Sequence, residues 1–208
     1  MFNPPSHPII IEKREHMKLY RWKTLGDYDP EQCFLDAAPK GLGARSAHLS
    51  HGKPVTALYP EDPCVQLSEE NPGIRLESFI GNTKRMLVVS SPLRAVLEKW
   101  CQEQDIEYLP VHIYNHRGRL HTSDYSIINP LGTLDCLDRE RSHVEMMKDV
   151  VLSVERIVLS PAKLERAPHL FRVREDPSVY VVSESLAEAL RAGAFTNVVL
   201  EPMEVAPA

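Results

Sequence analysis

The amino-acid sequence predicts an α+β protein with a mixed, mainly antiparallel sheet and two or three helices. Two stretches carry this prediction, because in each an apolar run typical of a buried strand passes through a serine into a pattern of helical period. They cover residues 86–104 and 180–193. A third observation is the alternation of apolar and charged side chains over residues 18–22, which indicates a half-buried strand near the start of the domain.

The chain of 208 residues has the length of one domain. Residues 1–16 are rich in proline and then charged, and they predict a flexible lead-in. A single α+β domain is expected over residues 17–203. Its irregular part covers 17–84, where glycine and proline recur too often for long elements, and its more regular part covers 85–203. Residues 204–208 are expected to form a C-terminal tail.

The regular part begins with an apolar strand over residues 86–89, continuous enough to be buried on both faces. Ser90 and Pro92 are typical of a helix start, a serine cap followed by proline in the first turn. Apolar residues then recur at helical spacing, which predicts a helix as far as about residue 104.

A hairpin is expected next. Residues 106–114 read as an extended segment in which Pro110 favours an edge or irregular position, because proline cannot donate to a strand ladder. Residues 115–118 predict a turn, and residues 119–129 the returning strand.

The C-terminal third predicts short strands over residues 154–159 and 170–173. A further strand over 180–182 leads into Ser183 as a helix cap, with a helix that ends at Gly193. A last strand is expected over residues 198–200.

The two strand-to-helix junctions share the pattern Val-Val-Ser-x-x-Leu-x-x-x-Leu, at residues 88–97 and 181–190. Two interpretations fit this pattern. It is either an internal β-α-β pseudo-repeat or a generic junction between a buried strand and a capped helix. Both describe architecture and neither carries chemistry.

Composition excludes several classes of protein. The 24 Lys and Arg against 29 Asp and Glu give a net charge of −5, whereas a protein held on nucleic acid by its phosphates is expected to be basic. No run approaches the ~18 apolar residues of a membrane helix, and no secretory signal is recognisable, so a cytoplasmic location is expected. Four scattered cysteines without a C-x-x-C pair are expected to be reduced and mostly buried: Cys33, Cys64, Cys101 and Cys136.

The usual enzyme fingerprints are missing, so neither catalytic residues nor a cofactor are predicted. An enzyme nevertheless stays open as an alternative. His112, His116 and His121 surround the predicted hairpin and either converge on a metal ion or stay exposed near the turn. Another histidine pair, His48 and His51, is interpreted as part of a solvated loop.

The most distinctive polar cluster is Asp135-Cys136-Leu137-Asp138. The paired carboxylates either perform acid–base chemistry, hold a cation, or pin a structural turn whose Cys136 and Leu137 point inward. Cys136 is a poor candidate nucleophile, because neighbouring carboxylates raise the pKa of a thiol.

A second acidic stretch runs over residues 61–77, where Arg75 is the only basic residue. It is either a solvated loop or an electronegative face for a basic partner. Seven carboxylates from the two clusters are therefore candidate partner-binding residues: Glu61, Asp62, Glu69, Glu70, Glu77, Asp135 and Asp138.

The stretch from about residue 86 to 203 resembles the bacterial toxin-system immunity family eleven. The resemblance consists of short motifs in the right order rather than of one strong motif. They are the Val-Val-Ser junction at 88–90, residues 106–111, residues 124–129, Leu134-Asp135-Cys136-Leu137-Asp138 with Ser142, residues 170–173, and the Val-Val-Ser-Glu helix start at 181–184. Residues 18–22 look like the opening strand of the family, while residues 1–16 and much of 23–80 have no clear counterpart.

The resemblance implies an immunity protein that binds a cognate toxin, encoded by a neighbouring gene, and neutralises it by occlusion in the producing cell. Such pairs belong to polymorphic toxin systems and to contact-dependent competition, type VI secretion included. No catalytic residue comes with the family. The alternatives are a metal-dependent or hydrolytic enzyme centred on Asp135, Asp138 and the hairpin histidines, and a regulatory binding module without a toxin partner.

Overall fold

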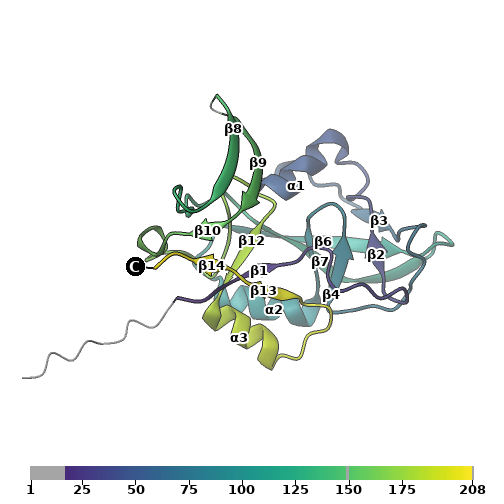
Figure 1. Cartoon of the computed structure of the whole chain (residues 1–208). Coiled ribbons are helices and arrows are strands. Elements are labelled where there is room, and N and C mark those ends of the chain that lie inside the picture. Colours follow the sequence, from purple (N-terminus) through teal and green to yellow (C-terminus); the bar gives the residue numbers. More distant parts are fainter. Residues whose placement is uncertain (1–16, 149, 208) are drawn as a thin grey trace, which may run out of the picture.

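The computed structural model describes residues 17–148 and 150–207; the lead-in predicted over residues 1–16 lies outside them. Within the described chain there are three α-helices, α1 (Ala47–His51), α2 (Ser91–Trp100) and α3 (Glu184–Ala192). Strands form two larger sheets and two pairs (Figure 1). The predicted α+β class is therefore confirmed. None of the helices in the described residues is long and apolar enough to cross a bilayer.

The larger sheet is mixed and has six strands. Its four central strands are antiparallel, whereas the short strand at either edge pairs in parallel. The order across it is β2 (Phe34–Leu35), β4 (Phe79–Asn82), β5 (Leu87–Ser90), β7 (Leu120–Pro130), β6 (Ile106–Tyr114) and β3 (Cys64–Gln66).

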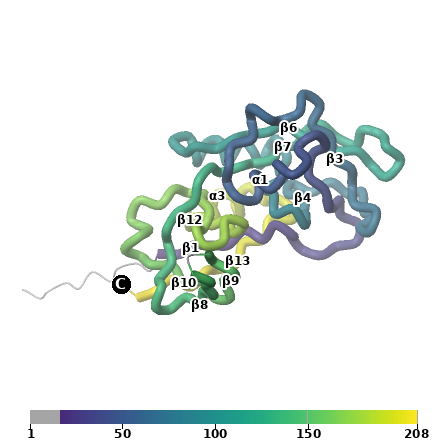
Figure 2. The backbone as a smooth tube through the Cα atoms, turned by 90° about the horizontal axis from the view of Figure 1, so that it is seen from above, coloured from purple at the N-terminus to yellow at the C-terminus, as the bar shows by residue number. Residues whose placement is uncertain are grey.

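The smaller sheet is antiparallel throughout. Its order is β11 (Leu170–Arg172), β12 (Tyr180–Ser183), β1 (Leu19–Trp22) and β13 (Leu200–Pro202). The two pairs are β10 (Val158–Leu159) with β14 (Glu204–Val205), and the hairpin of β8 (His143–Met147) with β9 (Val150–Arg156). From above, β3, β6 and β7 gather at one end of the molecule and β8 to β10 at the other (Figure 2).

The two strand-to-helix junctions have the same topology. β5 and β6, joined by α2, both lie antiparallel to β7 between them. β12 and β13, joined by α3, both lie antiparallel to β1 between them. Ser90 and Ser183 even share φ −67° and ψ 158° at the helix start. The shared sequence pattern thus marks two split β-α-β units of the same kind.

Both units face one hydrophobic core. α2 contributes Leu93 and Leu97, and α3 contributes Leu186 and Leu190, each fully or almost fully buried. Strands of both sheets supply most of the other residues of this core: Tyr20, Trp22, Phe79, Leu87, Val89, Ile128, Leu170, Tyr180 and Val182. The two sheets are therefore held together by the helices that lie in the same core.

Arg172 at the end of β11 is 1% exposed, and its side chain reaches from the smaller sheet to α1 and to the larger sheet. Its guanidinium donates to the carbonyl oxygens of Leu49 and Ser50 in α1 and of Pro130 at the end of β7. It also donates to Pro177 O, Asn129 Oδ1 and the Tyr180 hydroxyl, and it lies over the Tyr180 ring. Gly52 makes room for it: a Cβ there would lie 2.8 Å from Arg172 Cδ, and the residue has φ +64°.

Several predicted boundaries need correction. The helix expected to run to about residue 104 ends at Trp100, because Cys101 leaves helical geometry at φ −112°. The last strand, expected over 198–200, begins at Leu200, since Asn197 turns at φ 60° and its side chain binds the backbone at Asp27 and Phe79. The segment 154–159 is divided between β9 and β10.

One other segment differs in kind. The tail expected over residues 204–208 instead begins with β14, which pairs in parallel with β10. Pro110 agrees with the prediction of an edge or irregular position, because it lies in a part of β6 that is flanked by β7 alone: β3 pairs with β6 only from His112 onward.

Candidate partner-binding surfaces

The segment Asp135-Cys136-Leu137-Asp138 forms a pinned turn in the structure. Cys136 and Leu137 are fully buried, and Leu137 bridges to Leu159 of β10. Burial, with Glu175 and Asp135 nearby, raises the pKa of the Cys136 thiol to about 12. The thiol therefore stays protonated at neutral pH and is unsuited to nucleophilic attack.

The two carboxylates of this segment point to different cations. Asp135 accepts from Lys163 Nζ at 2.8 Å and from Arg174 at 3.1 Å, and the hydrogen bond from Lys163 lowers its pKa. Asp138 accepts from Arg141, both from the guanidinium at 2.9 Å and from the backbone N–H, and this lowers its pKa as well. Both carboxylates are thus engaged within the chain.

The three hairpin histidines are bound to separate partners. His112 Nδ1 lies 3.0 Å from Ser123 Oγ. His116 Nε2 lies 2.8 Å from the Ser68 carbonyl oxygen, and His121 Nε2 lies 2.9 Å from that of Ile74. No group of three or more metal-ligating side chains converges within residues 17–148 and 150–207.

The acidic stretch 61–77 is divided between exposed and buried carboxylates. Glu61, Asp62, Glu69 and Glu70 are exposed. Glu77 is different, because its side chain is 9% exposed and accepts from Arg75 Nε at 2.7 Å. The negative charge of the Glu77 carboxylate is thus neutralised by Arg75 within the chain.

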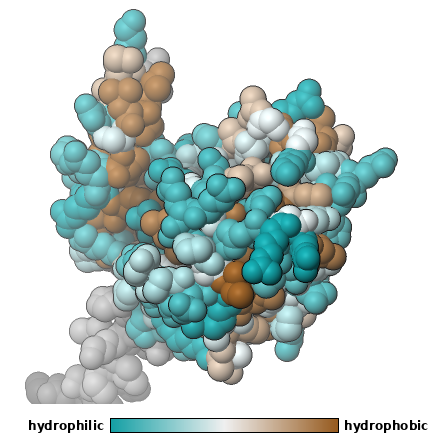
Figure 3. Space-filling view, turned by 90° about the vertical axis from the view of Figure 1, so that its right-hand side faces the viewer, coloured by the Kyte–Doolittle hydropathy of each residue, from teal (hydrophilic) through white to brown (hydrophobic). Residues whose placement is uncertain are grey.

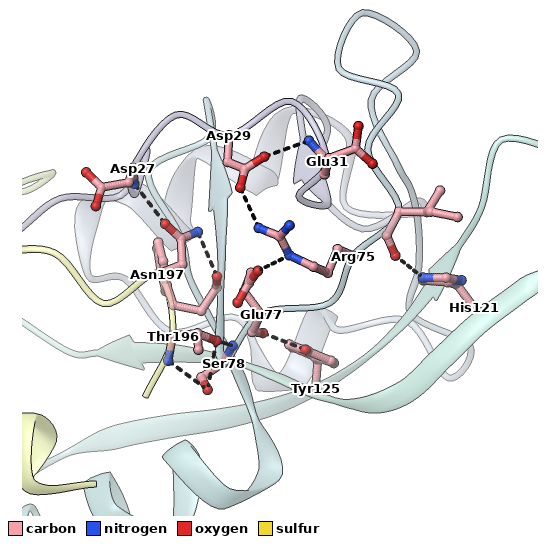
Figure 4. Close-up of polar contacts among 12 residues, drawn as sticks. Asp27, Asp29, Glu31, Arg75, Glu77, Ser78, His121, Tyr125, Thr196 and Asn197 are labelled. Atoms are coloured by element: carbon pink, nitrogen blue, oxygen red, sulfur yellow. Dashed lines mark hydrogen bonds and ion pairs between the residues drawn. The ribbon is translucent and has the colours of Figure 1, made fainter. Parts of the chain in front are cut away.

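Arg75 joins this stretch to a loop that is distant in sequence (Figure 4). Besides Glu77, its guanidinium binds Asp29, whose pKa is lowered chiefly by that hydrogen bond. The backbones are also bonded: Arg75 N donates to Glu31 O at 2.8 Å, and Cys33 N donates to Arg75 O at 2.9 Å.

The close contact between these segments requires Gly73, since a Cβ there would lie 2.2 Å from the carbonyl oxygen of Gln32. Residues 25–36 and 69–77 therefore form one continuous surface, called here the Tyr28 surface. Tyr28 is 87% exposed, and Leu25 and Ile74 are each more than half exposed. Large exposed apolar side chains amid polar ones are typical of interaction sites.

A second exposed apolar surface lies on the β8–β9 hairpin, which projects from the body of the protein (Figures 1 and 3). Its exposed apolar side chains are Met146, Met147, Val150 and Leu152, each between 43% and 59% exposed. At its base, Val144 and Val154 pack on the core formed around Leu137 and Leu159.

The sequence predicted Glu69, Glu70 and Glu77 of the Tyr28 surface as candidate contacts but did not predict Tyr28 or the acidic loop around it. Asp27, Asp29 and Glu31 alternate with other residues over 27–31, which was the available signal. The hairpin was missed except for its last residues, because nothing in 143–153 marks a tight turn of the usual glycine-containing kind.

Fold and surface together define an α+β protein whose described residues include two groups of exposed apolar side chains, one on the Tyr28 surface and one on the β8–β9 hairpin. The family model described as "Immunity protein family (Imm11)" matches residues 20–205, nearly the whole chain, so the chain belongs to this immunity protein family. The match includes residues 23–80, much of which has no clear counterpart in the resemblance seen from the sequence alone; these residues supply β2, β3 and β4 of the larger sheet. Among proteins of curated function, none matches the chain.

Proposed function

We propose that this protein binds a cognate toxin in the cytoplasm of the producing cell and neutralises it by occlusion. The observation that carries the proposal is the match to an immunity protein family over residues 20–205. Families of immunity proteins are generally non-enzymatic, and binding by a preformed surface needs no catalytic residue.

The structure supports a binding role through its exposed surfaces. The Tyr28 surface and the β8–β9 hairpin hold eight of the large exposed apolar side chains of the described residues, an arrangement suited to binding a protein partner. The carboxylates of Asp135 and Asp138, also candidate contacts, are only partly exposed and are engaged by Lys163, Arg174 and Arg141. They are the weaker candidates for direct contact.

The toxin is expected to be the product of a neighbouring gene, within a polymorphic toxin system of the kind used in contact-dependent competition. The test is co-expression of that product with this protein, together with titration calorimetry of the purified pair. Rescue of growth and a stoichiometric complex are the expected results. Absence of both a complex and rescue would refute the proposal.

The enzyme alternative is tested by metal analysis of the purified protein. Stoichiometric zinc or manganese would favour it, whereas the separate partners of His112, His116 and His121 lead us to expect none.

A further inference from the structure

The Tyr28 surface contains a cavity of about 350 Å³, within the size range of sites that receive a ligand or a protruding side chain. Its apolar lining includes Leu25, Tyr28 and Phe34, and its polar lining includes Asp27 and Asp29. An aromatic ring beside carboxylates is the combination that recognises a guanidinium or ammonium group, by stacking and by charge-assisted hydrogen bonds.

The charge of the surface is strongly one-sided. Residues 25–36 and 69–77 contain seven acidic residues and one basic residue, Arg75, while the whole chain has a net charge of only −5. The negative charge of the protein is thus concentrated here, and the remainder of the chain is close to neutral. Such a face accelerates association with a basic partner and disfavours acidic ones.

The cations near the cavity are already bound. Arg75 is held by Asp29 and Glu77, and Lys23 at the cavity edge lies 3.3 Å from Glu201. In contrast, Asp27 and Glu31 are exposed and form no ion pair with any other residue in the described chain. These two carboxylates are available to a partner without breaking an existing pair.

We propose that the Tyr28 surface is the docking site for a basic, arginine-bearing segment of the toxin, with one guanidinium stacked on Tyr28 beside Asp27 in the cavity and with Glu31, outside the cavity, attracting a further basic residue of the segment. This inference rests on the proposed function, because it names the surface and the chemistry by which the toxin is recognised. The β8–β9 hairpin is the rival surface, and the test separates the two.

The first arm of the test measures toxin binding by titration calorimetry. Tyr28→Ala removes the ring, and the double variant Asp27→Lys with Glu31→Lys reverses the free charges. Each is expected to weaken the toxin complex at least about tenfold, as loss of a central aromatic or charged anchor does. The double variant is also expected to flatten the dependence of affinity on salt concentration.

Two variants serve as matched controls. Glu165→Lys makes the same kind of charge reversal at one exposed residue that lines a different cavity, so it changes the net charge half as much as the double variant does. Leu152→Ala removes an exposed apolar side chain from the hairpin. Both are expected to bind the toxin within about twofold of wild type. Thermal unfolding of every variant verifies that it is folded.

The second arm uses a fluorescent hexa-arginine peptide in place of the toxin, measured by anisotropy at low ionic strength. Wild type and Glu165→Lys are expected to bind it, and the double lysine variant is expected to lose it. This measurement tests the Tyr28 surface even if the product of the neighbouring gene is not the partner of this protein.

The outcomes are distinguishable. If the toxin binds but only Leu152→Ala weakens the complex, the hairpin is the interface and the inference is overturned while the proposed function stands. If the toxin does not bind wild type but the peptide requires Asp27 and Glu31, the proposed function fails and the basic-segment site stands. If the toxin binds and neither the toxin nor the peptide depends on these residues, only the inference is refuted. If the toxin does not bind wild type and the peptide does not depend on these residues either, both are refuted.

Discussion

Arg172 places a positive charge in the interior against neutral oxygen atoms only. Six of them accept its hydrogen bonds, and they belong to α1, to the end of β7, to the β11–β12 connection and to the first residue of β12. Burying a charge is costly unless its donors are satisfied, and here the carbonyls of a helix end and of a strand end satisfy them. A single side chain therefore connects segments that lie more than 120 residues apart.

We predict that Arg172→Met lowers the free energy of unfolding by at least about 3 kcal/mol, because several buried acceptors lose their donor at once. Arg172→Lys is the control for charge: it keeps the cation but has three donors in place of five, and an intermediate loss is expected. Urea unfolding followed by circular dichroism measures both. A loss below about 1 kcal/mol in the methionine variant would show that the network contributes little.

Glu107 in β6 is a second residue whose role only the fold reveals. Burial opposes its charge, but hydrogen bonds from Thr56, Asn129 and the backbone of Val55 outweigh it and lower its pKa below the usual 4.5. A carboxyl whose pKa is lowered by folding stabilises the protein above its unfolded pKa. That stabilisation is lost as the pH falls through the folded value.

We therefore predict that Glu107→Gln destabilises the protein at pH 7, since the amide nitrogen cannot accept the same hydrogen bonds. The difference from wild type should shrink as the pH falls below the usual 4.5 and through the lowered folded pKa of Glu107, where the native carboxylate becomes protonated. Urea unfolding of both proteins at neutral pH and at about pH 3.5 measures this. A difference that stays constant with pH would contradict the charged role of Glu107.

At the scale of elements, α2 and α3 begin in the same way but are capped differently. The Ser183 hydroxyl accepts from Leu186 N–H and also lies 2.8 Å from His169 Nδ1. Ser90 has the same backbone geometry, yet its side chain makes no cap hydrogen bond. The two serines are a matched pair within one chain.

Ser183→Ala is expected to cost about 1–2 kcal/mol of stability, whereas Ser90→Ala is expected to cost less than about 0.5 kcal/mol. Thermal or urea unfolding of the two variants side by side provides the measurement. Equal losses of stability would mean that the stabilisation by each serine comes from the shared backbone geometry and not from the cap hydrogen bond.

The length and periodicity of each element explain which elements the sequence could predict. Both strand-to-helix units were recognised because their apolar residues repeat with a clear period over ten or more positions. The strands β2, β3 and β14 span two or three residues each, and their partners lie far along the chain, so local pattern does not define them. Register in such short strands is set by tertiary pairing.

The candidate site also has a part that the sequence predicts and a part that it does not. The carboxylates of 69–77 are evident as a local excess of charge, and the pinned turn at Asp135–Asp138 was among the interpretations weighed. Tyr28 could not be placed beside them, because the bridge between Gln32 and Arg75 joins segments 43 residues apart. Loop-to-loop contacts of this kind depend on backbone hydrogen bonds that any residue type can make.

At the scale of the whole molecule, the shared core has a consequence for unfolding. Trp22 of the smaller sheet lies 5.6 Å from Phe79 of the larger sheet, measured between ring centroids, and both helices pack into the same core. Neither sheet can separate without exposing the leucines of α2 and α3. Domains that share one core generally unfold in a single cooperative step.

We predict that the fluorescence of Trp22, isolated in a Trp100→Phe variant, and the far-ultraviolet circular dichroism follow the same urea curve. Trp22 reports on the junction of the sheets, since it is 1% exposed, whereas circular dichroism reports on both sheets and the helices together. Coincident midpoints and slopes are expected because the core does not divide at the boundary between the sheets. Two separated transitions would show instead that each split β-α-β unit folds on its own, and the pseudo-repeat would then be a pair of independent modules rather than two halves of one core.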